Sequence, residues 1–362
     1  MSSEATHSRS AAKPLLIILA AVLLPLTVVF ILHSNRLNRE ARILTARGWR
    51  YAAADGDYSL SYLATGNDAG AHRIIALADL GVNDYSIQLR NFCSALGDSN
   101  LIVCIDRAGC GMSIDTQTPQ TVEQIVSDYR TALKNANIEP PYVLLPHAFG
   151  GIYAAYWESM YPDEIEGVFF LDAAVPDAED AAPQPEKAAK CKQILAHLGI
   201  QRLKKYPLPV GFSGAETQSA RFLNIRGAMT AAQISERQLA TENCRKVSQS
   251  IVTNDIPKAY INAASYKSPE DWLAADDWAR TFRRLPDLTD DARRQLAEEQ
   301  VSRAAAYETD VLQPYLERLG SCRYYALSGD TCIYMQKPMQ CAVLLSQFFT
   351  EIEGQSKQVN HE

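Results

Sequence analysis

Short apolar segments alternate with helical segments along most of the chain, and this alternation constrains the fold more than any other feature. Uninterrupted apolar runs are typical of strands buried on both faces of a parallel sheet, with helices as the crossovers. The expected strands cover 58–64, 73–78, 101–106, 142–147, 167–172, 258–263 and 323–328, and the clearest helix covers 121–136. The sequence therefore predicts an α/β fold, with a mostly parallel central sheet and helices on both faces.

The folded domain is expected to span 51–352 and to be followed by a polar tail at 353–362. Within it, 175–254 has helical segments and no strand signal, which indicates a helical insertion. Ligands of open α/β sheets bind at the carboxyl ends of the strands, so this insertion is expected to form a lid there. The net charge of −7 and the lack of a basic stripe argue against a nucleic-acid partner.

An uncharged apolar run occupies residues 14–32, and about 20 apolar residues suffice to span a bilayer. We therefore expect a single transmembrane helix at 14–33, after a polar N-terminus at 1–13 and before a polar, mostly solvated neck at 34–50, with the lipid bilayer as partner. The alternative is a cleaved signal peptide, whose apolar core is usually shorter, about 7 to 15 residues.

Charges beside the apolar run bear on its orientation. Two basic residues precede it, whereas five arginines follow it: Arg36, Arg39, Arg42, Arg47 and Arg50. By the positive-inside rule, this asymmetry places the large domain in the cytoplasm.

The cysteines carry little functional signal. The eight cysteines form no CxxC pair and no Cys/His zinc spacing, so no metal site is expected. Cys322 and Cys332 are close enough in sequence to form a disulfide if the compartment is oxidising.

The segment VLLPHAFGG, residues 143–151, places a sharp turn with small residues between an expected strand and an expected helix. This is the setting of the nucleophile elbow, G-x-S-x-G, where small flanking residues are needed because the strained central residue must clear strand and helix. Pro146 and Gly150 take the flanking positions, and Ala148 stands where the serine would be.

Four segments together resemble the α/β-hydrolase superfamily in order and spacing: DRAGCGMS (106–113), PPYVLLPHAFGG (140–151), YPDEIEGVFFLDAAVP (161–176) and SGDTCIYMQKP (328–338). The sequence is most similar to membrane-anchored bacterial α/β hydrolases that read P-H-S-x-x-G at the elbow. This resemblance implies a domain outside the cytoplasmic membrane, the opposite of the orientation that the arginines predict. No cofactor is expected.

The resemblance also assigns the catalytic positions. The nucleophile position falls on Ala148 and the histidine position on Thr331, and neither side chain can do that chemistry. In the oxyanion loop, Asp79 and Leu80 stand where a backbone N–H faces the developing negative charge, and the carboxylate would repel it. Phe149 would supply the second N–H group of this region.

The acid of the family follows the strand at 258–263. The candidates there are Glu270, Asp271, Asp276 and Asp277. Asp271 is the candidate acid in our assignment, although an exposed helical face explains the whole group equally well. Of the six histidines, only His361 follows the last expected strand, and it lies in the polar tail.

Departures at the nucleophile, histidine and oxyanion positions together favour a natural pseudo-hydrolase over a single engineered Ser→Ala change. The expected function is to bind a small apolar ligand or a protein partner in the cleft. The alternative is an active hydrolase, esterase-like, or a lyase that uses residues such as His147 with Asp79. Near the cleft, Ser113 is expected to cap a helix, and Cys110 is expected to be an inert thiol.

Overall fold

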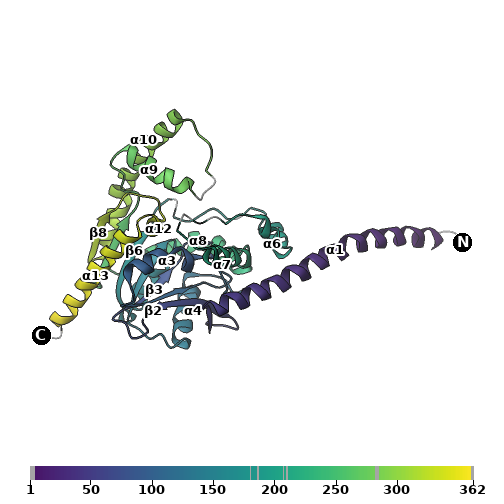
Figure 1. Ribbon diagram of the computed structural model, residues 1–362, viewed down its shortest axis with the longest axis horizontal. Helices are drawn as coiled ribbons and strands as arrows, with labels where there is room; N and C mark the ends of the chain where they lie inside the picture. Colours follow the sequence, from purple (N-terminus) through teal and green to yellow (C-terminus); the bar gives the residue numbers. More distant parts are fainter. Residues whose placement is uncertain are drawn as a thin grey trace.

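The computed structural model (Figure 1) describes residues 5–359 except 180, 186, 207, 209, 210 and 282–284, and it describes side chains from residue 16 to residue 354 with residue 22 also excepted. The first four residues of the predicted polar N-terminus and the last three of the polar tail, His361 among them, lie outside the described residues.

An eight-stranded sheet forms the centre of the domain, with the strand order β1-β2-β4-β3-β5-β6-β7-β8. The pairs β1–β2 and β2–β4 are antiparallel and the other five pairs are parallel. The strands are β1 (Arg50–Ala53), β2 (Ser59–Gly66), β3 (Arg73–Leu77), β4 (Leu101–Ile105), β5 (Tyr142–Ala148), β6 (Ile165–Ala173), β7 (Lys258–Asn262) and β8 (Cys322–Ala326). The predicted mostly parallel sheet is confirmed. Only β1 was not expected, because this short edge strand buries a single side chain and has no apolar run.

Helices cover both faces of the sheet, as predicted (Figure 1). They are α1 (Ala5–Ala46), α2 (Tyr85–Gln88), α3 (Arg90–Leu96), α4 (Val122–Asn135), α5 (Gly150–Met160), η1 (Pro162–Glu164), α6 (Ala189–His197), η2 (Ile200–Leu203), α7 (Gly214–Arg226), α8 (Ala231–Ser250), α9 (Pro269–Arg280), α10 (Asp290–Tyr307), the π-helical turn η3 (Glu308–Leu312), α11 (Gln313–Leu319), α12 (Ile333–Gln336) and α13 (Pro338–Val359).

The alternation of side chains along the strands divides the core into two layers. On β3, Ile75 and Leu77 pack with α4 and α5 on one face, whereas Ile74 and Ala76 pack with α3, α12 and α13 on the other. All four side chains are fully buried. Burial on both faces explains why the strand sequences are continuously apolar rather than alternating.

Two helical segments extend beyond the sheet. The described part of the predicted insertion between β6 and β7 is helical, with α6, η2, α7 and α8 and no strand. A second segment between β7 and β8 contains α9 to α11, and α9 and α10 stand apart from the sheet in Figure 1.

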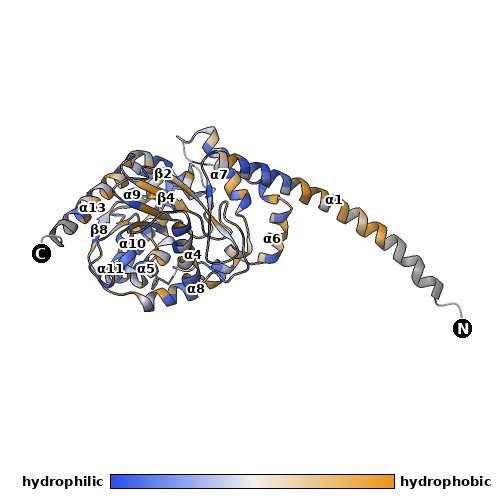
Figure 2. Cartoon of the chain, turned by 90° about the horizontal axis from the view of Figure 1, so that it is seen from below, coloured by the Kyte–Doolittle hydropathy of each residue, from blue (hydrophilic) through white to orange (hydrophobic). Residues whose placement is uncertain are grey.

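The predicted anchor and neck form a single helix, α1, rather than separate segments. Its portion Leu16–Ala46 is long and apolar enough to cross a membrane, and Figure 2 shows the apolar stretch projecting away from the domain. After the apolar run at 14–32, His33 and Leu44 on the same helix are buried, and the Arg47 guanidinium donates a hydrogen bond of 2.6 Å to the hydroxyl of Ser219 on α7. The neck is therefore docked on the insertion, which its polar sequence could not indicate.

Candidate functional site

The elbow between β5 and α5 keeps the geometry that its sequence predicts. Ala148 has a φ of 45°, the left-handed conformation that residues with a side chain rarely adopt. A Cβ atom on Gly150 would lie 2.3 Å from the carbonyl oxygen of Leu77, and one on Gly151 would lie 2.6 Å from the Cβ of Ala173. The turn therefore requires glycine at both positions, and it presents a methyl group where the G-x-S-x-G elbow has its serine.

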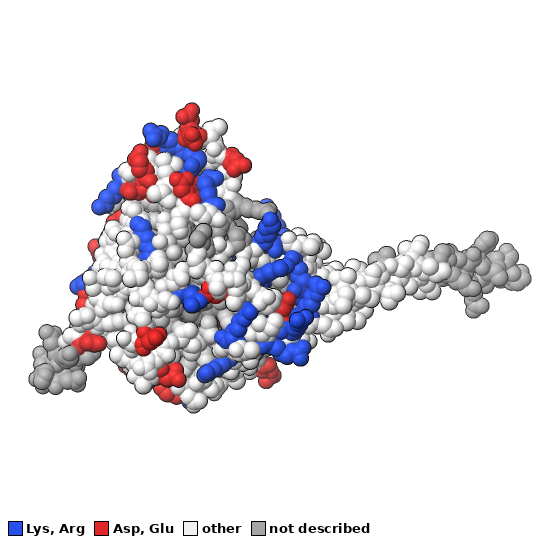
Figure 3. Space-filling model, in the orientation of Figure 1, with Lys and Arg blue, Asp and Glu red and all other residues white. Residues whose placement is uncertain are grey.

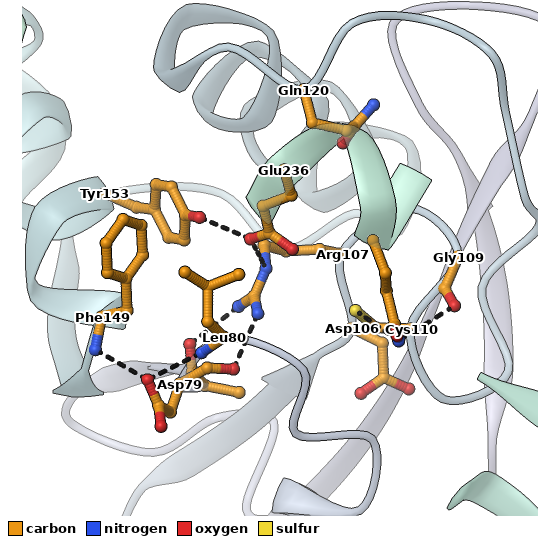
Figure 4. A network of polar contacts seen from close by, with 12 residues as sticks. Asp79, Leu80, Asp106, Arg107, Gly109, Cys110, Gln120, Phe149, Tyr153 and Glu236 are labelled. Atoms are coloured by element: carbon orange, nitrogen blue, oxygen red, sulfur yellow. Dashed lines mark hydrogen bonds and ion pairs between the residues drawn. The ribbon is translucent and has the colours of Figure 1, made fainter. Parts of the chain in front are cut away.

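The side chain of Asp79 occupies the place where an oxyanion would be stabilised (Figure 4). Its Oδ1 atom accepts hydrogen bonds from the backbone N–H groups of Leu80, at 2.7 Å, and of Phe149, at 3.1 Å. These are the two N–H groups that the sequence assigned to the oxyanion region. Because a carboxylate already takes both donors, they are not free to stabilise the negative charge of an acyl-transfer transition state.

A buried ion pair holds the loop that carries Asp79 (Figure 4). The guanidinium of Arg107 donates to the carbonyl oxygens of Ala78, at 2.7 Å, and Asp79, at 2.8 Å. Its Nε atom lies 2.5 Å from Oε1 of Glu236 on α8, and the Tyr153 hydroxyl also donates to that carboxylate. Sequence reasoning missed this network, because no local pattern indicates that α8 packs against the loop after β3.

Asp172 stands opposite the degenerate histidine position. It is the second-last residue of β6, with a φ of 46°, and its Oδ1 accepts a hydrogen bond of 2.9 Å from the backbone N–H of Ala263. The nearby side chain of Thr331 favours the charged form of this carboxyl group and so opposes the effect of burial on its pKa. Burial raises the pKa of Asp172 above its usual value. Asp172 is the one charged residue that closes the apolar run GVFFLD, and this was the sequence signal that could have identified it.

Asp271, the candidate acid from the sequence, lies at the start of α9. It belongs to the capping box of this helix, where its Oδ2 accepts hydrogen bonds from the backbone N–H groups of Lys267, at 2.9 Å, and Ser268, at 3.1 Å. It does not line the pocket described below. The structure thus brings Asp172, and not Asp271, to the position that faces Thr331.

His147 lies behind the elbow rather than in the pocket. Its Nε2 atom is 3.0 Å from the carbonyl oxygen of Thr331, so Nε2 carries the proton of the neutral ring. Its buried Nδ1 atom has no hydrogen-bond partner in the described part of the chain, and the ring packs against Tyr85 and Tyr334. Burial lowers the pKa of His147, although the charges of Asp79 and Asp172 oppose that shift. No hydrogen bond joins His147 to Asp79 among the described residues.

A pocket of about 620 Å³ opens above the elbow. Asp79, Ala148, Phe149 and Asp172 line it from the ends of the strands. The predicted insertion contributes Val175, Ala178, Ala181, Pro183 and Arg237. The segment between β7 and β8 contributes Trp272, Gln300, Arg303, Ala304 and Tyr307. Both helical segments therefore wall the pocket, whereas only the first was expected to do so.

Two other residues near the pocket are structural. Ser113 was predicted to cap a helix, but it lies in a loop. Its hydroxyl accepts a hydrogen bond of 2.7 Å from the backbone N–H of Ser61 and donates one of 2.8 Å to the carbonyl oxygen of Asp106. The next helix, α4, has Thr121 as its cap. Burial raises the pKa of Cys110 to about 12, which keeps it a protonated, weakly reactive thiol.

The cysteines and the possible metal ligands were both predicted to carry little functional signal. No disulfide links any of the eight cysteines, and Cys322 and Cys332 do not form the bridge that an oxidising compartment would allow. Within the ranges that the structure describes, no three His, Cys, Asp or Glu side chains are grouped to hold a metal ion.

No family model matches the sequence. A protein of Bacillus subtilis known as uncharacterized protein YbdG is 31% identical over 157 residues, which cover 43% of this chain and 47% of that protein. The chain spans about half the length of the curated relatives that it matches.

Solved structures with the same fold cover most of the chain. The epoxide hydrolase CorEH superposes with a TM-score of 0.55 at 15% identity, over 84% of this chain and 99% of the other. A membrane phospholipase A, described as a bacterial virulence factor, superposes with a TM-score of 0.52 at 14% identity, over 96% and 99%. The chain therefore belongs to the α/β-hydrolase fold, as the sequence resemblance implied.

Proposed function

We propose that this protein is a membrane-anchored α/β-hydrolase-fold protein that binds a small amphiphilic ligand in its pocket and lacks acyl-transfer chemistry. The single observation that carries this proposal is the hydrogen bonding of Asp79, which accepts both backbone donors of the oxyanion region. Ala148 and Thr331 lack the reactive groups as well. Loss of triad residues lowers the rate of catalysis on the order of 10⁶-fold, and the residual rate acceleration then depends partly on the oxyanion region. In this protein the side chain of Asp79 fills that region.

The pocket has the size and lining of a binding site for a small molecule. Its volume of about 620 Å³ lies within the range of ligand pockets, roughly 300–1,000 Å³. Its walls combine small alanine side chains with the aromatic rings of Tyr260, Tyr266 and Trp272. An intact pocket over an elbow without a nucleophile supports binding rather than turnover.

The charges at the base of the pocket define the inner end of the ligand. Asp79 and Asp172 are both acidic and reach the pocket from the strand ends, whereas the basic Arg237 and Arg303 come from the covering helices α8 and α10. A ligand with a hydroxyl or amine group at its inner end would donate hydrogen bonds to these carboxyl groups. A carboxylate there would be repelled.

Binding is tested on the full-length protein in lipid nanodiscs with three probes that share one skeleton: phenylbutylamine, phenylbutanol and phenylbutyrate. Tryptophan fluorescence reports binding, because Trp272 lines the pocket. We expect the amine and the alcohol to bind more tightly than the carboxylate. Equal or tighter binding of phenylbutyrate would contradict the assignment of an acidic base to the pocket.

A matched pair of variants on α10 connects binding to the pocket. Ala304→Phe fills the pocket and is expected to abolish binding, whereas Ala306→Phe, on an exposed position of the same helix, is expected to leave it unchanged. In parallel, the unmodified protein is expected to be silent with p-nitrophenyl esters. Ester turnover that Ala304→Phe abolishes and Ala306→Phe preserves would overturn the proposed function.

A further inference from the structure

The segment formed by α6 and η2 exposes a group of large apolar side chains to solvent. Leu203 is 80% exposed and Ile194 is 62% exposed, and Leu195 and Ile200 are also exposed. Single exposed apolar residues are common, but four within ten consecutive residues form a surface that water solvates poorly. Such a surface is expected to contact another apolar phase.

The same segment is strongly basic. Residues 187–205 include six lysine or arginine residues and no aspartate or glutamate. Figure 3 shows lysine and arginine side chains gathered on the part of the domain from which α1 projects. A groove of about 430 Å³ lies here, and four of its lining residues are basic: Arg202, Lys204, Lys205 and Arg221. Apolar side chains interspersed with basic ones are typical of surfaces that rest on anionic membranes.

Contacts with α1 place this segment at the end of the apolar helix. His33, the first residue after the apolar run, is buried, and Gly199 packs so closely on its ring that a Cβ there would lie 2.7 Å from Nδ1. Arg202 donates hydrogen bonds of 2.6 Å and 3.0 Å to the carboxylate of Glu40. At 1.5 Å per residue, His33 lies about 1.5 Å and Glu40 about 12 Å beyond the end of the apolar run. The headgroup layer is about 5–7.5 Å deep on each side of the bilayer, so these contacts extend from that layer to just outside it.

We propose that α6 and η2 form a membrane-docking surface that contacts the anionic lipid headgroups of the bilayer in which α1 is embedded. This inference rests on the membrane anchoring in the proposed function, and it adds the lipid class and the part of the domain that faces it. The lysine and arginine side chains bind phosphate groups, and Ile194, Leu195, Ile200 and Leu203 enter the interface between headgroups and acyl chains.

The natural Cys191 on α6 provides the probe. It is the exposed thiol among the cysteines, all the others being buried or half-buried, so an environment-sensitive NBD dye can be attached there. The labelled full-length chain is reconstituted into vesicles of phosphatidylcholine, with or without phosphatidylglycerol. Lipids spin-labelled near the headgroup serve as quenchers. We expect a blue-shifted, quenched dye with phosphatidylglycerol, and a weaker effect without it or at high salt.

Two variants separate the charge contribution from the apolar one. Lys204→Glu with Lys205→Glu is expected to remove the dependence on phosphatidylglycerol. Leu203→Glu is expected to reduce quenching in both kinds of vesicle. The matched charge control is Lys134→Glu with Arg294→Glu, at exposed positions on α4 and α10, and it should leave the dye signal unchanged. The matched apolar control is Met339→Glu, because the side chain of Met339 on α13 is 63% exposed.

Flotation on a density gradient distinguishes the two proposals. Protein that floats with the vesicles but keeps a solvent-exposed, unquenched dye would overturn the docking surface, leave the anchor intact and favour an acidic protein as the occupant. Protein that does not float would overturn the anchor and the docking surface with it. An equal loss of quenching in the control and test variants would also overturn the docking surface.

Discussion

Two arginine–glutamate pairs hold the two regions on which our proposals rest, and they differ in burial. Arg107 and Glu236 lie beneath the oxyanion loop, with side chains that are each 2% exposed. Arg202 and Glu40 connect η2 to the neck of α1, with side chains that are 15% and 12% exposed. The first pair is enclosed by protein, and the second lies where solvent or lipid headgroups can reach it.

This difference in burial gives two ion pairs of the same residue types different structural roles. Deep in the domain, the Arg107 guanidinium orients the loop that places Asp79. Because this guanidinium is removed from water, leaving it without its partner carboxylate would cost much free energy. At the neck, the Arg202–Glu40 pair aligns two elements with a smaller energetic contribution that salt can screen. Changes in the interior should therefore affect stability and chemistry strongly, whereas changes at the neck should have modest effects.

The largest effect is expected from breaking the interior pair. Glu236→Ala leaves the Arg107 guanidinium charged and unpaired, so we expect the free energy of unfolding to fall by about 3–5 kcal/mol. Urea unfolding followed by circular dichroism measures this loss. The control is Glu242→Ala on the same helix, where the carboxylate is exposed and pairs with Arg245. Equal losses in both variants would contradict the distinction between the two regions.

Asp106 should make the stability of the interior depend on pH. Burial raises its pKa to about 7, above the value of about 4 in an unfolded chain. Between these pH values only the folded state holds the proton, so the free energy of unfolding falls as pH rises from about 4 to 7, by at most about 4 kcal/mol at 1.36 kcal/mol per pKa unit.

Unfolding titrations across this pH range test the assignment to Asp106. Asp106→Asn should make the profile less steep, with the remaining slope due to other buried carboxyls of raised pKa such as Asp172, whereas Asp98→Asn, at an exposed position, should not change it. A profile that Asp106→Asn leaves as steep as before would assign the pH dependence to other groups.

The next effect concerns rebuilding catalysis. Ala148→Ser with Thr331→His should stay silent with p-nitrophenyl esters, because Asp79 still takes both N–H groups. Adding Asp79→Gly empties the oxyanion region and should raise turnover by about 10²–10³-fold, the contribution of one such donor. Adding Asp79→Asn instead keeps an acceptor in place and should give a smaller gain. Full turnover in the double variant would show that Asp79 does not block the site.

The smallest effect is expected at the neck. Glu40→Gln removes the charge that pairs with Arg202, and we expect a loss of roughly 1 kcal/mol or less in the free energy of unfolding. Added salt should reduce that loss, since the pair is partly open to solvent. Glu298→Gln, at an exposed position on α10, serves as the control and should have no effect. A loss as large as that of Glu236→Ala would contradict the contrast in burial.

The features that could be predicted from the sequence are those that depend on local or periodic interactions. The strands, the sheet type and the elbow could be predicted, since continuous apolar runs and small residues around a tight turn report on local geometry. The proximity of Asp172 to Thr331 could not, because Asp172 lies in β6 and Thr331 in the loop after β8, and the two come together only in the folded sheet. Asp271 had an equally good local pattern, and the structure uses it to cap a helix.

By itself, the sequence determined that this is an α/β chain with an apolar N-terminal helix and an elbow that presents a methyl group. These features depend on residue identity and spacing alone. Only the tertiary structure decided that Asp79 fills the oxyanion region, that two helical segments share the pocket, and that the neck docks on η2. Each of these involves residues far apart in the chain, and their contacts depend on how the helices pack on the sheet rather than on any local pattern.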